Sequence, residues 1–257
     1  MTASIALALT PPVQYVLRIG DTCLIGAQRL AEWCGHAAIL EEDIALANMA
    51  LDLLGQARAL LTHAGRLEGQ GRDEDQLAFL RDERDFFNPT LVELPRGDFA
   101  LTVLRNTIAS TWLKLLWERL ADSSDAELAG IAGKAVKEAR YHQRHAADWV
   151  VRLADGTDES RRRIDAALLA LWRYVPELFA ADAVDAAAQA SRLGPSWAEL
   201  RAPWQAEMAQ IFESARLVAP PEGAFLSTGR QGRHSEHMGR LLAEMQHLQR
   251  SFPGGVW

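Results

Sequence analysis

Residues 41–56 read EEDIALANMALDLLGQ, and this stretch decides the fold class. Its apolar residues recur at helical spacing, and the same pattern extends from about Ile39 to Leu67. The acidic residues Glu41, Glu42 and Asp43 open the pattern, where they suit the positive end of a helix. We therefore predict a long amphipathic helix over this range.

A second long helix is predicted on the N-terminal side. Apolar residues recur at helical intervals from about Val13 to His36, and this segment contains no proline. The turn between the two ranges is short, so the two helices should run antiparallel. Beyond the second helix, residues 69–97 are polar and carry Pro89 and Pro95, which predicts a crossover of short helices and loop.

The rest of the chain also reads as helix. Two more long helices are predicted from about Asp98 to Ala121 and from about Asp125 to Ala154, each with its aspartate as N-cap. Further helical patterns cover about 158–190, 196–218 and 235–251, and no alternating strand pattern appears. This order predicts an all-α, ferritin-like four-helix bundle with additional C-terminal helices.

The length of 257 residues fits one enlarged hydrophobic core, so we predict a single domain over residues 1–257, with residues 1–12 flexible. The net charge of −7 argues against a nucleic-acid surface. We also expect no membrane contact, because no apolar run approaches the ~20 residues of a membrane span. Cys23 and Cys34 lie roughly 16 Å apart on one predicted helix, beyond disulfide reach. Unpaired thiols and the lack of a signal peptide pattern predict a cytoplasmic protein.

The positions where a di-iron site would lie are unusual. In di-iron bundles two helices each supply a Glu and two each supply Glu-x-x-His, because three residues bring both groups to one inward face. Here Asp52 is followed three residues later by Gly55, and Glu138 by Tyr141, with His142 one position too far round. The third long helix has no acid in its middle. We therefore predict no bound metal and no catalytic residue. The residues of the predicted vestigial pocket are Asp21, Asp52, Gly55, Glu138, Tyr141 and His142.

Two interpretations of the remaining polar residues stay open. One is a buried network of hydrogen bonds and ion pairs, since buried polar groups need partners. The other is a surviving single-metal site, because Glu138, His142 and His145 fall at i, i+4 and i+7 on one helix face. The members of the predicted network are Arg18, Asp21, Gln28, Asn48, Asp52, Arg105 and Glu138.

Five stretches carry a resemblance to a known family. They read LRIGDTCL at 17–24, QRLAEWCGH at 28–36, LDLLGQAR at 51–58, KEARYH at 137–142 and LLAEMQ at 241–246. From about residue 15 to residue 257 the chain resembles the C subunits of bacterial phenylacetyl-CoA 1,2-epoxidase, also called ring 1,2-phenylacetyl-CoA oxygenase, the PaaC family. The resemblance implies a structural, ferritin-like subunit without iron, which supports a homologous catalytic A subunit that carries the di-iron centre.

The resemblance also implies the wider system. Its cofactors would lie elsewhere, with di-iron in the A subunit and NADPH, flavin and iron–sulfur chemistry in a reductase subunit, while a B subunit would be a further partner. The assembled oxygenase would use O₂ to convert phenylacetyl-CoA to its ring 1,2-epoxide in aerobic phenylacetate degradation. Two alternatives stay open, namely an independent ferritin-like metal-binding protein and a helical interaction module.

One loop is a candidate contact site. Residues 227–234 read STGRQGRH and lie just ahead of the last predicted helix, where backbone N–H groups and arginines could hold a carboxylate or a phosphate. The candidate contacts for a partner or an anion are Arg230, Arg233 and His234. Since the family places CoA mainly in the catalytic subunit, partner carboxylates are the favoured ligands. The alternative is a mobile, solvated loop.

Overall fold

The computed structural model describes residues 4–255, and these residues contain helices joined by turns and loops. The one β-type pairing within this range is an isolated bridge between Thr228 and Arg233. The prediction of an all-α fold is therefore confirmed. The prediction that residues 1–12 are flexible falls in part on residues 1–3, which lie outside the described range.

The chain forms two compact units. The first contains residues up to Pro95 together with the segment from Ser227 onward, and the second runs from Arg96 to Leu226. Each unit contributes one of the two long helix pairs that a ferritin-like fold requires. The single domain over residues 1–257 stays a prediction, and the two units are described separately.

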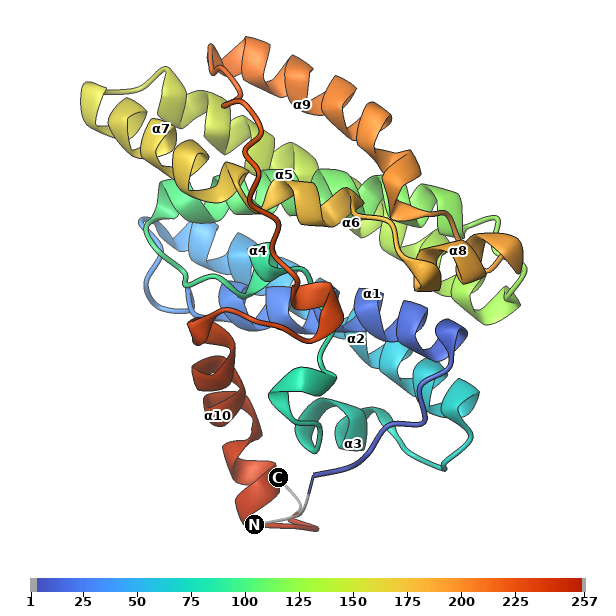
Figure 1. Cartoon of the computed structure of the whole chain (residues 1–257). Helices are drawn as coiled ribbons and strands as arrows, with labels where there is room; N and C mark the ends of the chain where they lie inside the picture. The colour runs from blue at the N-terminus through green and yellow to red at the C-terminus, as the bar shows by residue number, and fades with distance from the viewer. Residues whose placement is uncertain (1–3, 256–257) are drawn as a thin grey trace. The chain divides into compact units, whose positions relative to one another are not determined.

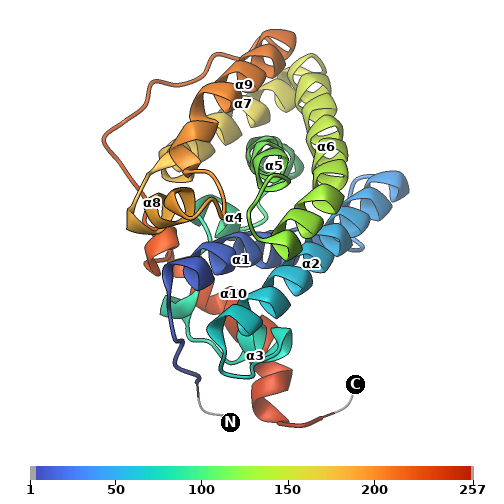
Figure 2. The same cartoon turned by 90° about the vertical axis from the view of Figure 1, so that its right-hand side faces the viewer.

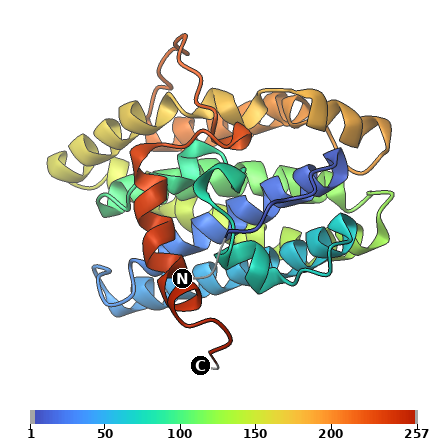
Figure 3. The same cartoon turned by 60° about the horizontal axis from the view of Figure 1, so that its bottom comes forward.

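The first unit is built on α1 (Pro11–Ala31) and α2 (Leu40–Glu68), which lie side by side (Figure 1, Figure 3). A short turn joins them, as predicted. Gly20 permits their close approach, since a Cβ atom there would lie 3.3 Å from Cβ of Leu60. α1 begins at Pro11, a residue type favoured in the first turn of a helix, and ends before the predicted His36.

Short helices and the C-terminal segment complete the first unit. The crossover contains α3 (Glu74–Phe79), η1 (Glu83–Asp85) and α4 (Thr90–Glu93), which confirms short helices and loop. The turn η4 (Gly229–Gln231) precedes α10 (Glu236–Ser251). α10 packs against α3, η1 and α4, so this unit is assembled from both ends of the chain.

The second unit is built on α5 (Phe99–Leu120) and α6 (Ala126–Ala154). The predicted N-caps are confirmed, because the Asp98 and Asp125 carboxylates accept the backbone N–H groups of Leu101 and Leu128. The other elements of this unit are α7 (Asp158–Trp172), η2 (Val175–Phe179), α8 (Ala183–Ala190), η3 (Trp197–Leu200) and α9 (Arg201–Ala215). Figure 2 shows α5 end-on with α6, α7 and α9 around it, which explains its buried tryptophans.

One helix prediction in the second unit is wrong. The pattern at 158–190 is not one helix, since α7 ends at Trp172 and α8 begins only at Ala183. Pro176 lies between them and cannot donate the backbone hydrogen bond that a continuing helix needs. Asp182 then caps α8 by accepting the N–H groups of Val184 and Asp185. Apolar periodicity continued across the break and hid it.

α2 is also the one helix of the described residues that is long and apolar enough to cross a membrane, and 44% of its apolar window is buried. Core helices pass the same test of length and composition, so this is weak evidence. The expectation of no membrane contact stays a prediction.

Candidate functional site

Asp21 lies at the centre of a fully buried ion pair in the first unit. Arg81 donates to both oxygens of its carboxylate, with Nη1 3.0 Å from Oδ2, and the backbone N–H of Phe87 donates to Oδ2 at 2.9 Å. Neither side chain is exposed to solvent. The Arg81 guanidinium also lies 4.1 Å from the centre of the Phe86 ring. Asp21 therefore has its acceptor sites occupied from within the chain and is not available as a metal ligand.

The two predicted positions on α2 do not lie on its inner face. Asp52 is half-buried, and Gly55 is exposed, with no atom within 4 Å of where its Cβ would be. The interpretation of Gly55 as a deleted inward ligand is therefore wrong. The buried polar residues of α2 include Gln56 and His63 instead, and Gln56 Oε1 lies 3.5 Å from the Sγ of Cys23.

The predicted positions on α6, in the second unit, are also turned relative to expectation. Tyr141 is 42% exposed, whereas His142 is buried. The inward residue of this helix is therefore His142, and the assignment of Tyr141 to an inward ligand position is wrong. Glu138 is mostly buried and lies 3.8 Å from the amino group of Lys134, one turn earlier.

Neither of the two open interpretations of the polar residues is found in full. Within residues 4–255, no three His, Cys, Asp or Glu side chains are grouped so that they could hold a metal ion, and this includes Glu138, His142 and His145. The predicted network named Asp21 correctly as a buried ion-pair member but missed its partner, and Asn48 is exposed. Arg81 lies in the crossover, where no periodic pattern signals a buried residue.

The best-defined polar cluster joins His234 to Glu93 of α4. His234 Nδ1 lies 2.6 Å from Oε2 of Glu93, and Nε2 lies 2.9 Å from the carbonyl oxygen of Phe86. Glu93 also accepts hydrogen bonds from the amide of Asn88 at 2.9 Å and from the backbone N–H of Ser235 at 2.6 Å. The side chains of His234 and Glu93 are both 0% exposed. The cluster fastens the start of α10 to the crossover.

The charge state of His234 follows from its two neighbours. Both ring nitrogens face oxygen acceptors, and only the imidazolium donates from both. Burial by itself lowers the pKa of His234, but the hydrogen bond and negative charge of Glu93, the Phe86 carbonyl and the charge of Asp21 outweigh it. The net effect raises the pKa of His234, which favours a buried imidazolium–carboxylate pair.

The loop at 227–234 is packed against the crossover. A Cβ atom at Gly229 would lie 2.5 Å from the carbonyl oxygen of Asn88, and one at Gly232 would lie 2.3 Å from that of Arg84. Arg230 is buried, whereas Arg233 is exposed. The prediction that His234 contacts a partner or an external anion is wrong, because both of its nitrogens are used internally. The carboxylate expected ahead of the last helix is present, and it is Glu93 of the same chain.

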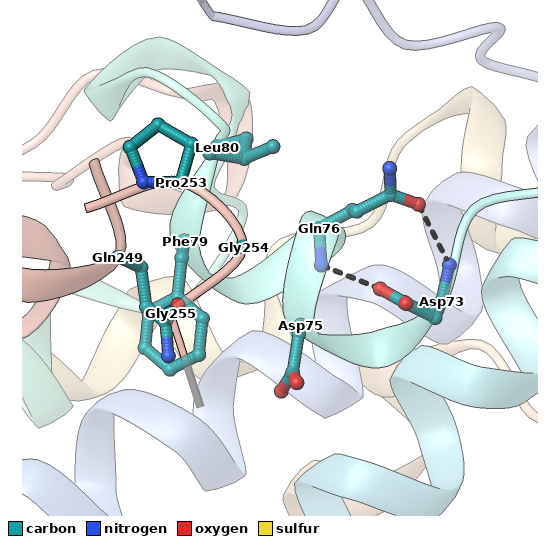
Figure 4. Close-up of a pocket in the computed structure, with 9 residues that line it drawn as sticks. All are labelled: Asp73, Asp75, Gln76, Phe79, Leu80, Gln249, Pro253, Gly254 and Gly255. Atoms are coloured by element: carbon teal, nitrogen blue, oxygen red, sulfur yellow. Dashed lines mark hydrogen bonds between the residues drawn. The ribbon is translucent and has the colours of Figure 1, made fainter. Parts of the chain in front are cut away.

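Two hollows open on the first unit. The first, of about 390 Å³, lies between α3 and the C-terminal residues 253–255. Figure 4 shows Asp73 and Gln76 bonded to each other and Asp75 pointing away from that pair. Burial raises the pKa of Asp75, and the charges of Asp73 and Glu74 add to the effect. The second hollow, of about 550 Å³, is lined by polar residues that include Arg84, Arg233 and His234. Neither contains a predicted metal-site residue.

The long helix pairs and the buried polar positions define a ferritin-like helical protein, and comparison with known proteins gives its family. The chain belongs to the family described as "Phenylacetic acid catabolic protein", whose model matches residues 2–257. A curated relative is the C subunit of the "1,2-phenylacetyl-CoA epoxidase" of Escherichia coli strain K12. It is 50% identical over 243 residues, which cover 95% of this chain and 98% of the relative. The resemblance inferred from the five sequence stretches is confirmed.

Proposed function

We propose that this chain is a non-catalytic, structural subunit of a multicomponent di-iron phenylacetyl-CoA 1,2-epoxidase in phenylacetate degradation. The observation that carries the proposal is the state of Asp21, whose carboxylate is held by Arg81 and the Phe87 N–H. A di-iron ligand needs free carboxylate oxygens directed at the metal. The relative of known name is itself a subunit of such an epoxidase.

The donor set of the long helices supports the same proposal. The buried residues of α6 are mainly alanines, and alanine offers no ligand atom; His142 is their one imidazole. In the middle of α5, Thr107 and Thr111 donate their hydroxyls to carbonyl oxygens one turn earlier in the helix. The residues present therefore do not fit a carboxylate-bridged di-iron centre, and no oxygen chemistry is assigned to them.

The partners follow from this role. We assign the di-iron centre to a catalytic A subunit and expect a B subunit in the assembly, with NADPH, flavin and iron–sulfur chemistry in a reductase subunit. This chain would contain no cofactor and act in the cytoplasm, without nucleic acid or membrane. An acidic chain with a net charge of −7 is consistent with that setting.

Co-expression with an A-type subunit, followed by metal analysis, tests the proposal. The two chains should co-purify, and iron should be present in the complex but absent from this chain purified alone. Failure to co-purify would contradict the proposal and favour a stand-alone helical interaction module. Stoichiometric, tightly held iron or manganese in the isolated chain would favour the alternative of an independent metal-binding protein.

A further inference from the structure

α2 exposes a row of large apolar side chains on the face opposite its packed side. Leu40 is 70% exposed, Ile44 52% and Leu51 63%. Their spacing of four and seven residues places them on one face of the helix. Gly55 lies on the same face with open space around it. We call Leu40, Ile44, Leu51 and Gly55 the outer face of α2.

The outer face is unusual because α2 already buries an apolar face. Leu46, Leu53 and Leu60 are packed inside the first unit, with at most 8% of each exposed. A helix that is apolar on opposite sides is normally covered on both. Single exposed leucines need no explanation, but a contiguous row of them on one helix marks a contact surface.

The outer face is complementary to a second copy of itself. In an antiparallel arrangement that sets Ile44 opposite Gly55 of the second copy, the large side chain meets the open position. The same register sets Glu41 opposite Arg58 of the second copy and Leu51 opposite Asn48 of the second copy. A two-fold pairing repeats each of these contacts. One register therefore satisfies shape and charge together.

Charge also separates this occupant from a bilayer. Glu41 and Asn48 are exposed at the flank of the outer face, and insertion into lipid would remove both from water. Arg58 pairs with Glu74 of its own chain at 3.2 Å but keeps 69% of its side chain exposed, so it remains accessible to a second carboxylate. Ion pairs at the rim of an interface select register and orientation.

We propose that two copies of this chain associate through an antiparallel contact between the outer faces of α2. This goes beyond the proposed function, because the contact involves neither the catalytic subunit nor a metal. The face from Leu40 to Arg58 is roughly 28 Å long at the α-helical rise. A strip of that length is smaller than a standard permanent interface, so the dimer dissociates on dilution.

Sedimentation equilibrium of the full chain over a hundredfold concentration range tests the proposal. The wild type should show a reversible monomer–dimer equilibrium. Gly55→Leu, which fills the open position, should weaken association at least tenfold while leaving thermal unfolding at or above the wild-type temperature. Leu248→Asp, at a 52% exposed position on α10, is the matched control and should dimerise as the wild type does.

A charge exchange tests the register. Glu41→Arg and Arg58→Glu should each weaken association, and the double variant should restore it. Glu74→Gln controls for the intrachain pair of Arg58 and should leave association unchanged. A monomeric wild type at all concentrations would overturn the proposal, as would a double variant no better than the single ones. Binding of the monomer to lipid vesicles through Ile44, abolished by Ile44→Asp, would assign the face to a membrane and also overturn it.

Discussion

The Nδ1 atom of His234 lies 2.6 Å from the Oε2 atom of Glu93, and neither side chain is exposed to solvent. The two residues are 141 positions apart in the chain. Their contact joins the C-terminal segment to α4, and the second ring nitrogen is held by the Phe86 carbonyl. A buried pair of this kind strongly opposes the loss of either partner.

The stability of the chain should depend on pH through His234. Its native pKa is raised above the unfolded value of about 6.5, so the pair contributes its full stability below that pH. The contribution is lost as the pH rises through the native pKa. Urea unfolding between pH 6 and pH 9 should show falling stability for the wild type and a flatter profile for His234→Gln. Equal slopes for the two proteins would contradict a charged His234.

Replacing Asp21 by Asn should destabilise the first unit by about 3–5 kcal/mol, because the Arg81 charge would remain buried without its counter-ion. Replacing both residues by apolar ones of similar size should recover much of this loss. Urea denaturation measures both. If Asp21→Asn were neutral and the double replacement were the more damaging, the ion pair would not be the dominant interaction.

Gly232→Ala should cost about 1–3 kcal/mol. Gly232 has a φ of 74°, and its Cβ would meet the Arg84 carbonyl oxygen. Gly133→Ala on the exposed side of α6 is the matched control, since no atom lies within 4 Å of that Cβ. It should stabilise by about 0.5–1 kcal/mol. Thermal unfolding of the two variants should therefore shift in opposite directions.

Glu138→Gln should leave the iron content of an assembled complex unchanged. Glu138 pairs with Lys134, whose side chain is 81% exposed, at 3.8 Å. Such pairs contribute little, so the expected change in stability is within about 0.5 kcal/mol. Loss of iron from a correctly assembled complex would show that the residue has a role at the metal.

The two arginines of the loop at 227–234 should behave differently. Arg230 is buried, and its replacement by Ala should cost about 0.5–3 kcal/mol through the lost packing of its side chain. Arg233 is exposed beside the larger hollow, so Arg233→Ala should change stability by less than about 0.5 kcal/mol. Titration of a partner subunit against Arg233→Ala then tests the predicted contact. Unchanged affinity would assign Arg233 to solvent.

Local sequence signals were sufficient for the helices and their caps. The long helices follow from apolar periodicity, and Asp98 and Asp125 cap where the pattern begins. The facing of α2 could not be predicted, because leucines occur on opposite sides of it and a choice between the sides is a choice of packing. The register of Gly55 was therefore assigned to the wrong face.

The polar cluster was out of reach for a different reason. Arg81 and Asp21 are 60 residues apart, and His234 is farther still from Glu93. No local pattern links residues at such separations, and the crossover that supplies Arg81 and Glu93 has no long helical period. The sequence indicated that buried polar groups would need partners, but the fold alone identifies them.

The first unit combines residues up to Pro95 with the segment that begins at Ser227, while the second is one continuous stretch. During synthesis on the ribosome, Glu93 emerges long before His234 and must wait for it. The continuous unit can acquire its structure while the chain is still growing, because its residues are already present. The first unit can close only after the last helix has been released, so truncation near the C-terminus removes support from residues made at the very start of translation.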